Sequence, residues 1–187
     1  MVPFRIDRKR AQALFDSWCH RGLFTPGDVR KAARLDKLKG IYLPFWTFSM
    51  RADSDWQAEI GEHWHQRIAK DKKIRRTEWH GLAGQHHSYH FHYLVSGSPG
   101  LPQEEAQAVY PFDLLAMRRY RPELLAGWLA EPLSVAREQA LATCEERFRE
   151  QEGERIKAFL PGDTQRNLDW STRFSEVSDD FVLLPFW

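Results

Sequence analysis

The feature that most constrains the fold is a short apolar run that occurs twice, as Leu43-Pro44-Phe45-Trp46 and as Leu184-Pro185-Phe186-Trp187. An apolar and aromatic run broken by one proline indicates a strand, with the proline at an edge, at a bulge or at the strand start. Because the two copies are equivalent, we expect them to lie side by side in one sheet. We also expect Trp46 and Trp187 to be largely buried.

The composition suits a folded protein without a covalent framework. Hydrophobic residues make up 42% of the 187 residues, which is enough for a packed core and argues against disorder. Cys19 and Cys144 are far apart and form no C-x-x-C pair, so neither a zinc ribbon nor a disulfide framework is predicted. Since there is no apolar run of transmembrane length and no signal-peptide pattern, we expect a cytoplasmic protein without a membrane segment.

The chain begins with a helical pattern over residues 1–39. Apolar residues at helical spacing predict an amphipathic helix over about 8–20, with Asp7 as its N-cap. A second helix opens at Thr25, where Pro26 suits the first helical position. We therefore expect an N-terminal helical hairpin.

From Gly40 the hydrophobic period changes to two, and residues 40–95 predict β-hairpins. The pattern places a turn at Ala52–Asp55, a loop at Gln66–Lys73 and a well-defined strand at 86–95. In this last strand, alternation places His86, Ser88, His90 and His92 on one face.

Residues 101–160 predict helices, the last of them over about 135–157, with Leu141, Cys144 and Phe148 on one apolar stripe. Residues 164–187 predict the closing strands. Strands followed by helices and again by strands indicate a single α+β domain with a mainly antiparallel sheet, on which the helical hairpin and the long C-terminal helix pack.

Several sequence blocks resemble an uncharacterised bacterial family whose members are often labelled zinc-ribbon proteins or relatives of the primosomal replication-restart helicase. The blocks are Val2-Pro3-Phe4, Lys37 to Phe48, Pro111-Phe112-Asp113-Leu114, Tyr120 to Gly127 and Val182 to Trp187. The resemblance spans nearly the whole chain. It implies a zinc ribbon ahead of this region and a further hairpin after it, and neither is found in this sequence. No G-x-x-x-x-G-K-[ST] loop occurs, so ATP-driven unwinding is not predicted.

Two H-x-H pairs are the strongest candidates for metal ligands. Residues two apart on a strand project to the same face, so His63 with His65 and His90 with His92 could each offer two imidazoles to zinc or another divalent metal. If the two strands are neighbours, all four side chains would converge. The simpler alternative is a solvated row of histidines without any cofactor.

Nothing in the sequence carries a catalytic signature, because neither a G-x-S-x-G nor an H-E-x-x-H motif occurs. We therefore expect a non-enzymatic interaction or scaffold module that binds an unknown protein partner or a second copy of itself. Nucleic-acid binding is the alternative, with Trp79 available for stacking, although a net charge of +1 is low for a dedicated binder. The candidate cations are Arg8, Lys9, Arg10, Arg30, Lys31, Arg34, Arg75 and Arg76.

Overall fold

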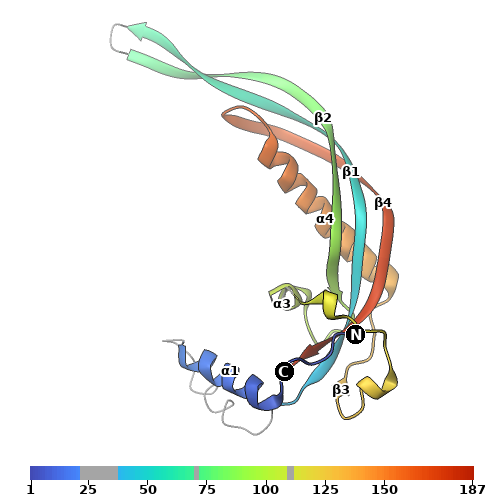
Figure 1. The fold of residues 1–187 in the computed structure, drawn as a ribbon. Coiled ribbons are helices and arrows are strands. Elements are labelled where there is room, and N and C mark those ends of the chain that lie inside the picture. The colour runs from blue at the N-terminus through green and yellow to red at the C-terminus, as the bar shows by residue number, and fades with distance from the viewer. Residues whose placement is uncertain (22–37, 70–71, 109–111) are drawn as a thin grey trace. The chain divides into compact units, whose positions relative to one another are not determined.

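The computed structural model describes residues 1–21, 38–69, 72–108 and 112–187, and it shows the predicted α+β fold. Within this described part of the chain, the sheet has four strands, and the longest helix lies along it (Figure 1). In chain order, the elements are α1 (Arg8–Arg21), β1 (Ile41–Ala69), β2 (Lys72–Ser96), α3 (Gln103–Ala108), the 3-10 turns η1 (Leu114–Ala116) and η2 (Pro122–Leu124), β3 (Leu129–Ala130), α4 (Arg137–Phe159) and β4 (Thr164–Phe186).

Strand β1 is the centre of the sheet and pairs with each of the other three strands. The short strand β3 is parallel to it, with Ile41 opposite Leu129. Strand β4 is antiparallel to it, because rising residue numbers in β1 meet falling numbers in β4. Hydrogen bonds show this order in the pairs Ser54–Thr172, Gln57–Asp169 and Glu59–Asn167.

The chain divides into two compact units. Unit 1 consists of residues 1–47, 94–140 and 180–187, and unit 2 of residues 48–93 and 141–179. Strands β1, β2 and β4 each contribute residues to both units.

Both copies of the repeated run lie in unit 1, on the paired strands β1 and β4, as predicted. The rings of Phe45 and Phe186 stack with their centroids 6.0 Å apart. One core cluster contains residues from both runs, namely Val2, Leu43, Phe45, Leu94, Ala106, Val182 and Leu184. The prediction for the two tryptophans is wrong, since both are only half-buried. The indole Nε1 of Trp46 donates to the Val135 carbonyl at 3.0 Å, and that of Trp187 donates to the Ile6 carbonyl at 3.1 Å.

Strands β1 and β2 form one long hairpin, where the sequence pattern predicted several. The predicted turn at Ala52–Asp55 is wrong, because β1 continues through it, and strand also extends into the predicted loop at Gln66–Lys73. Asp53 and Asp55 lie on one face of β1 and accept hydrogen bonds from β2, from His87 at 2.7 Å and from Gln85 at 2.8 Å respectively. The polar residues that resemble a turn in the sequence thus form cross-strand pairs in a continuous strand.

The predictions for the helices were partly correct. Helix α4 has nearly the predicted bounds, and Cys144 and Phe148 on its stripe are buried. Helix α1 is present and Asp7 caps it, accepting from the Arg10 amide at 2.7 Å. The second helix of the predicted hairpin falls almost wholly on residues outside the described part. Between residues 112 and 130 the expected helices are reduced to η1 and η2, after which Gly127, with φ of +84°, turns the chain into β3.

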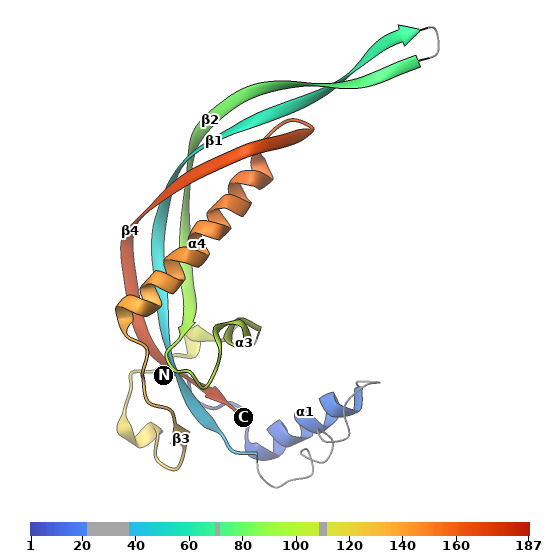
Figure 2. The same ribbon diagram turned by 180° about the vertical axis from the view of Figure 1, so that it is seen from behind.

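In unit 2, α4 lies along the sheet, and the β1–β2 hairpin continues beyond the end of this helix and the start of β4 (Figures 1 and 2). Under α4, every second residue of β1 is buried, namely Ala52, Ser54, Trp56, Ala58 and Ile60. Beyond Gly61 this burial ends, and the side chains of residues 62–68 and 73–79 are exposed or half-buried. We call this part of the hairpin, residues 62–69 and 72–79, the ribbon. At its base the His63 amide donates to Asp163 Oδ2 at 2.7 Å.

Candidate functional site

A buried carboxylate lies between α4 and the sheet of unit 2. The side chain of Glu152 is fully buried and accepts hydrogen bonds from three residues of β2 that share one face, as their alternation predicted. The donors are His86 Nδ1 at 2.7 Å, Ser88 Oγ at 2.5 Å and His90 Nε2 at 2.9 Å. Arg155 approaches the same carboxylate at 3.2 Å. We call these five residues the Glu152 cluster.

Burial and hydrogen bonding together determine the charge states of Glu152 and His90 in this cluster. Burial raises the pKa of Glu152, but the hydrogen bonds from Ser88, His86 and His90 outweigh this effect, so the pKa lies below its usual 4.5. Burial lowers the pKa of His90 from 6.5, and the hydrogen bond to Glu152 only partly opposes this effect. Glu152 is therefore ionised near neutral pH and accepts a hydrogen bond from a neutral His90. The His90 ring also stacks on Phe148, with the two ring centroids 4.0 Å apart. Because these hydrogen bonds join α4 to β2, the cluster holds α4 on the sheet.

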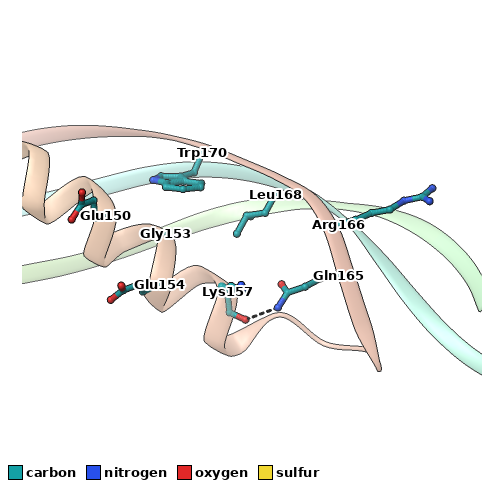
Figure 3. Close-up of a pocket in the computed structure, with 8 residues that line it drawn as sticks. All are labelled: Glu150, Gly153, Glu154, Lys157, Gln165, Arg166, Leu168 and Trp170. Atoms are coloured by element: carbon teal, nitrogen blue, oxygen red, sulfur yellow. Dashed lines mark hydrogen bonds between the residues drawn. The ribbon is translucent and has the colours of Figure 1, made fainter.

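A cleft of about 480 Å³ opens where α4 passes β4 (Figure 3). Most of the surface that lines the cleft is apolar, and the charged groups of its residues lie at the margin. The residues are Glu150, Gly153, Glu154 and Lys157 from α4, and Gln165, Arg166, Leu168 and Trp170 from β4.

Trp170 forms the preformed floor of the cleft. Its Nε1 donates to the Arg149 carbonyl at 3.1 Å, and its ring lies directly against Gly153, where a Cβ would collide with it. At the other end, Gln165 donates from Nε2 to the Lys157 carbonyl at 3.2 Å. These two contacts join β4 to α4 at both ends of the cleft.

One edge of β4 is free beside this cleft. Among the described strands, β4 pairs with β1 alone, and the Val2 amide donates to its Leu183 carbonyl at 2.9 Å, so beside the cleft its outer edge has unpaired backbone groups. Residues Asn167 and Glu176 have positive φ values of 53° and 51°, which is typical of β-bulges. Residues 168–175 between them form a regular stretch of open edge.

The ribbon has two chemically different faces. His63 Nδ1 lies 3.0 Å from Thr77 Oγ1, which sets the register of the two strands, and alternation then assigns each side chain to a face. The basic face carries His63, His65, Arg67, Lys73 and Arg75. The opposite face is mixed and carries Glu62, Trp64, Gln66, Ile68, Ile74, Arg76 and Glu78, of which Trp64 is 46% and Ile68 53% exposed.

The predicted convergence of His63, His65, His90 and His92 is wrong. His63 is opposite Thr77, whereas the His92 amide donates to Ser49 Oγ, and 14 residues of β1 separate these positions, about 46 Å of strand. His92 also has a φ of 48°, so it leaves the face shared by His86 and His90. Across the described residues, no group of three or more His, Cys, Asp or Glu side chains is arranged to hold a metal ion. These four histidines therefore do not share one metal site, and zinc binding stays a prediction.

The candidate nucleic-acid residues are dispersed. Arg8, Lys9 and Arg10 are exposed in the first turn of α1. Arg30, Lys31 and Arg34 fall outside the described residues. Arg75 is on the basic face of the ribbon, while Arg76 is on the other face and donates to Gln66 Oε1 at 3.2 Å. Trp79 is half-buried, because the Arg166 guanidinium lies 4.0 Å from the centre of its ring.

Sequence reasoning missed Glu152 and the cleft. The signal for Glu152 was present, since it continues the spacing of four residues that joins Cys144 to Phe148 and on to Ile156, on an otherwise apolar stripe. The cleft had no such signal, because Gly153 and Trp170 come together only when α4 packs beside β4.

The chain is similar over its full length to an uncharacterised protein, YdjG, of Bacillus subtilis (strain 168), with 25% identity over 188 residues. The match covers 100% of the chain and 55% of YdjG, so the chain spans about half the length of this curated relative. No family model matches the sequence, and no solved structure matches it significantly. None of the described helices has the length and apolar character needed to cross a membrane.

Proposed function

We propose that this protein is a non-enzymatic interaction module that holds an extended segment of a partner protein at the free edge of β4 in unit 2. One observation carries the proposal: an apolar cleft of ligand size lies next to an unpaired strand edge. An open edge can pair with an incoming strand through its backbone N–H and C=O groups, and a neighbouring pocket for a side chain adds specificity.

The cleft favours one large apolar side chain. Its volume of about 480 Å³ is within the range of binding pockets, and Trp170 and Leu168 provide an apolar surface. Because the Trp170 ring is already fixed by Arg149 and Gly153, binding does not have to order it. A preformed aromatic floor reduces the entropic cost of binding.

The margin of the cleft favours basic residues on either side of that apolar side chain. Glu150 and Glu154 project from α4 at one end of the cleft, with Lys157 at the other (Figure 3). Arg166 points away from the cleft and is held by Glu59 at 2.7 Å. A peptide with Lys or Arg near Glu150 and Glu154 would therefore meet complementary charge.

The test uses a fluorescein-labelled peptide of seven residues, alternating Thr and Val, with a central Phe flanked by Lys. Fluorescence anisotropy with the whole protein should show saturable binding. A peptide with Pro in place of both Val residues should bind at least 10-fold more weakly, since Pro donates no backbone hydrogen bond and cannot extend a sheet. Equal binding of the two peptides would contradict strand addition.

Two protein variants locate the site. Trp170→Ala should weaken binding by 10-fold or more, since aromatic anchors dominate such interfaces, whereas the control Trp64→Ala on the ribbon should leave it unchanged. Glu154→Lys should lower affinity for the Lys-flanked peptide by about 2–5-fold and raise it for a Glu-flanked one, as expected for an exposed ion pair. The proposal fails if no tested peptide binds, or if sedimentation shows that a second copy of the chain occupies the β4 edge and peptide does not displace it.

A further inference from the structure

The basic face of the ribbon is a concentration of positive charge separate from the cleft. Arg67 is opposite Lys73 and Arg75 is opposite His65 in the register set by His63 and Thr77. The side chains of Arg67, Lys73 and Arg75 are exposed. Within the described part of the ribbon, alternation places no carboxylate on this face, and no ion pair neutralises these three cations.

The positive charge is confined to the ribbon, because the same face of the hairpin carries carboxylates closer to α4. Nearer to α4, this face carries Asp53, Asp55 and Glu59, and each of these carboxylates accepts a hydrogen bond from another side chain. Asp53 accepts from His87 and Arg51, which lower its pKa, and Glu59 accepts from Arg166 and Asn167. Arg51 and Arg166 therefore balance the charges of Asp53 and Glu59, and Asp55 has the neutral Gln85 as its partner, while Arg67, Lys73 and Arg75 have no carboxylate partner among the described residues. An anionic ligand would be attracted to the ribbon and not to the rest of the face.

We infer that the basic face of the ribbon binds the phosphate backbones of double-stranded nucleic acid. A two-stranded ribbon fits the major groove of a B-form duplex, which is about 12 Å wide. The free ribbon has about 8 residues in each strand, or roughly 26 Å, which is sufficient to follow such a groove. Arg67 on β1 and the pair Lys73 and Arg75 on β2 form two rows, suited to two phosphate backbones on either side of a groove.

A duplex fits these observations better than a single strand does. Proteins that bind single strands combine cations with exposed aromatic rings on which bases stack. The aromatic residue of the basic face, Trp79, is half-buried beneath Arg166, and Trp64 lies on the opposite face. The basic face therefore offers contacts to phosphates and no free aromatic surface for bases.

The experiment measures fluorescence anisotropy of a labelled 20-base-pair DNA duplex with the whole protein at several salt concentrations between 50 and 200 mM. Affinity should fall steeply with salt, because phosphate contacts release counterions. The triple variant Arg67→Gln, Lys73→Gln, Arg75→Gln should bind at least 10-fold more weakly at 50 mM salt. Its slope of log affinity against log salt should be smaller by about 2–3, as expected for three lost phosphate contacts.

A matched control separates the ribbon from net charge. Arg118→Gln, Arg119→Gln, Arg121→Gln removes the same charge from exposed positions of unit 1 and should leave affinity within about 2-fold. Both triple variants should keep the circular dichroism spectrum of the parent and its binding to the cleft peptide, since the ribbon lies outside the cores. This second readout distinguishes failure of the ribbon from failure of the β4 site.

Three results would overturn the inference. The first is equal loss of affinity in the two triple variants, which would indicate a nonspecific charge effect. The second is equal or tighter binding of a 20-nucleotide single strand. The third is that the protein binds phosphatidylserine vesicles but no duplex, which would assign the ribbon to an anionic lipid surface.

Discussion

Two segments of the same hairpin in unit 2 have similar sequences and opposite environments. Under α4, Trp56 is 8% and Ile60 5% exposed, whereas in the ribbon Trp64 is 46% and Ile68 53% exposed. All four residues continue one alternation along β1, so the strand presents them to the same side. The difference is that α4 covers the first pair and ends before it reaches the second.

This comparison shows that an alternating apolar pattern specifies a strand face and does not specify whether that face is covered. A two-stranded hairpin is marginally stable by itself, so the ribbon depends on the part of the hairpin beneath α4. The covered segment should therefore determine stability, while the ribbon should affect only the binding of duplex DNA that we infer for its basic face.

The largest effect is expected from truncating equivalent tryptophans. Trp56 is buried, and its ring packs edge-on against the Phe159 ring with the centroids 5.7 Å apart. Trp56→Ala should therefore lower the free energy of unfolding by about 4 kcal/mol. Trp64→Ala removes an exposed side chain and should cost less than about 1 kcal/mol. Urea denaturation followed by circular dichroism measures both. Similar losses for the two variants would mean that the ribbon is covered in solution.

A smaller difference in the free energy of unfolding is expected between variants of a buried and an exposed glutamate. Glu152→Ala removes the carboxylate that accepts from His86, Ser88 and His90 and leaves the buried His90 and the two half-buried donors unsatisfied, which should cost about 3 kcal/mol. Glu62→Ala on the exposed ribbon should change the free energy of unfolding by less than about 0.5 kcal/mol. If Glu152→Ala were neutral in the same denaturation experiment, the cluster would not hold α4 on the sheet.

The smallest effect concerns pH. The pKa of His90 is lower in the folded protein than its usual 6.5, so below that value the unfolded chain binds a proton that the folded chain does not. The free energy of unfolding should therefore fall as pH drops below about 6.5, and Glu152, whose pKa is lowered from 4.5, should add to the loss at more acidic pH. His90→Gln should flatten the curve below pH 6.5, because it removes the group that binds a proton only in the unfolded chain. Parallel pH profiles for the parent and His90→Gln would contradict this assignment.

Several features of the fold could be predicted from the sequence because short-range patterns specify them. The repeated run predicted the pairing of β1 with β4, and the apolar stripe through Cys144 and Phe148 predicted α4. Alternation also placed His86, Ser88 and His90 on one face, where they meet Glu152. In each case the physical cause is the period of a helix or a strand, which acts over a few residues.

Other features depended on partners far away in the chain. Asp53 and Asp55 resemble a turn locally, and only their hydrogen bonds to β2 show that β1 continues through them. The register of the long hairpin separates His63 from His92, although both H-x-H pairs have strand spacing. The length of α4 decides which part of the β1 alternation is buried, and the approach of Gly153 to Trp170 creates the cleft. The sequence by itself determined which side chains share a face, because local backbone geometry sets that. The tertiary structure alone decided which faces are covered, because burial depends on which elements pack together.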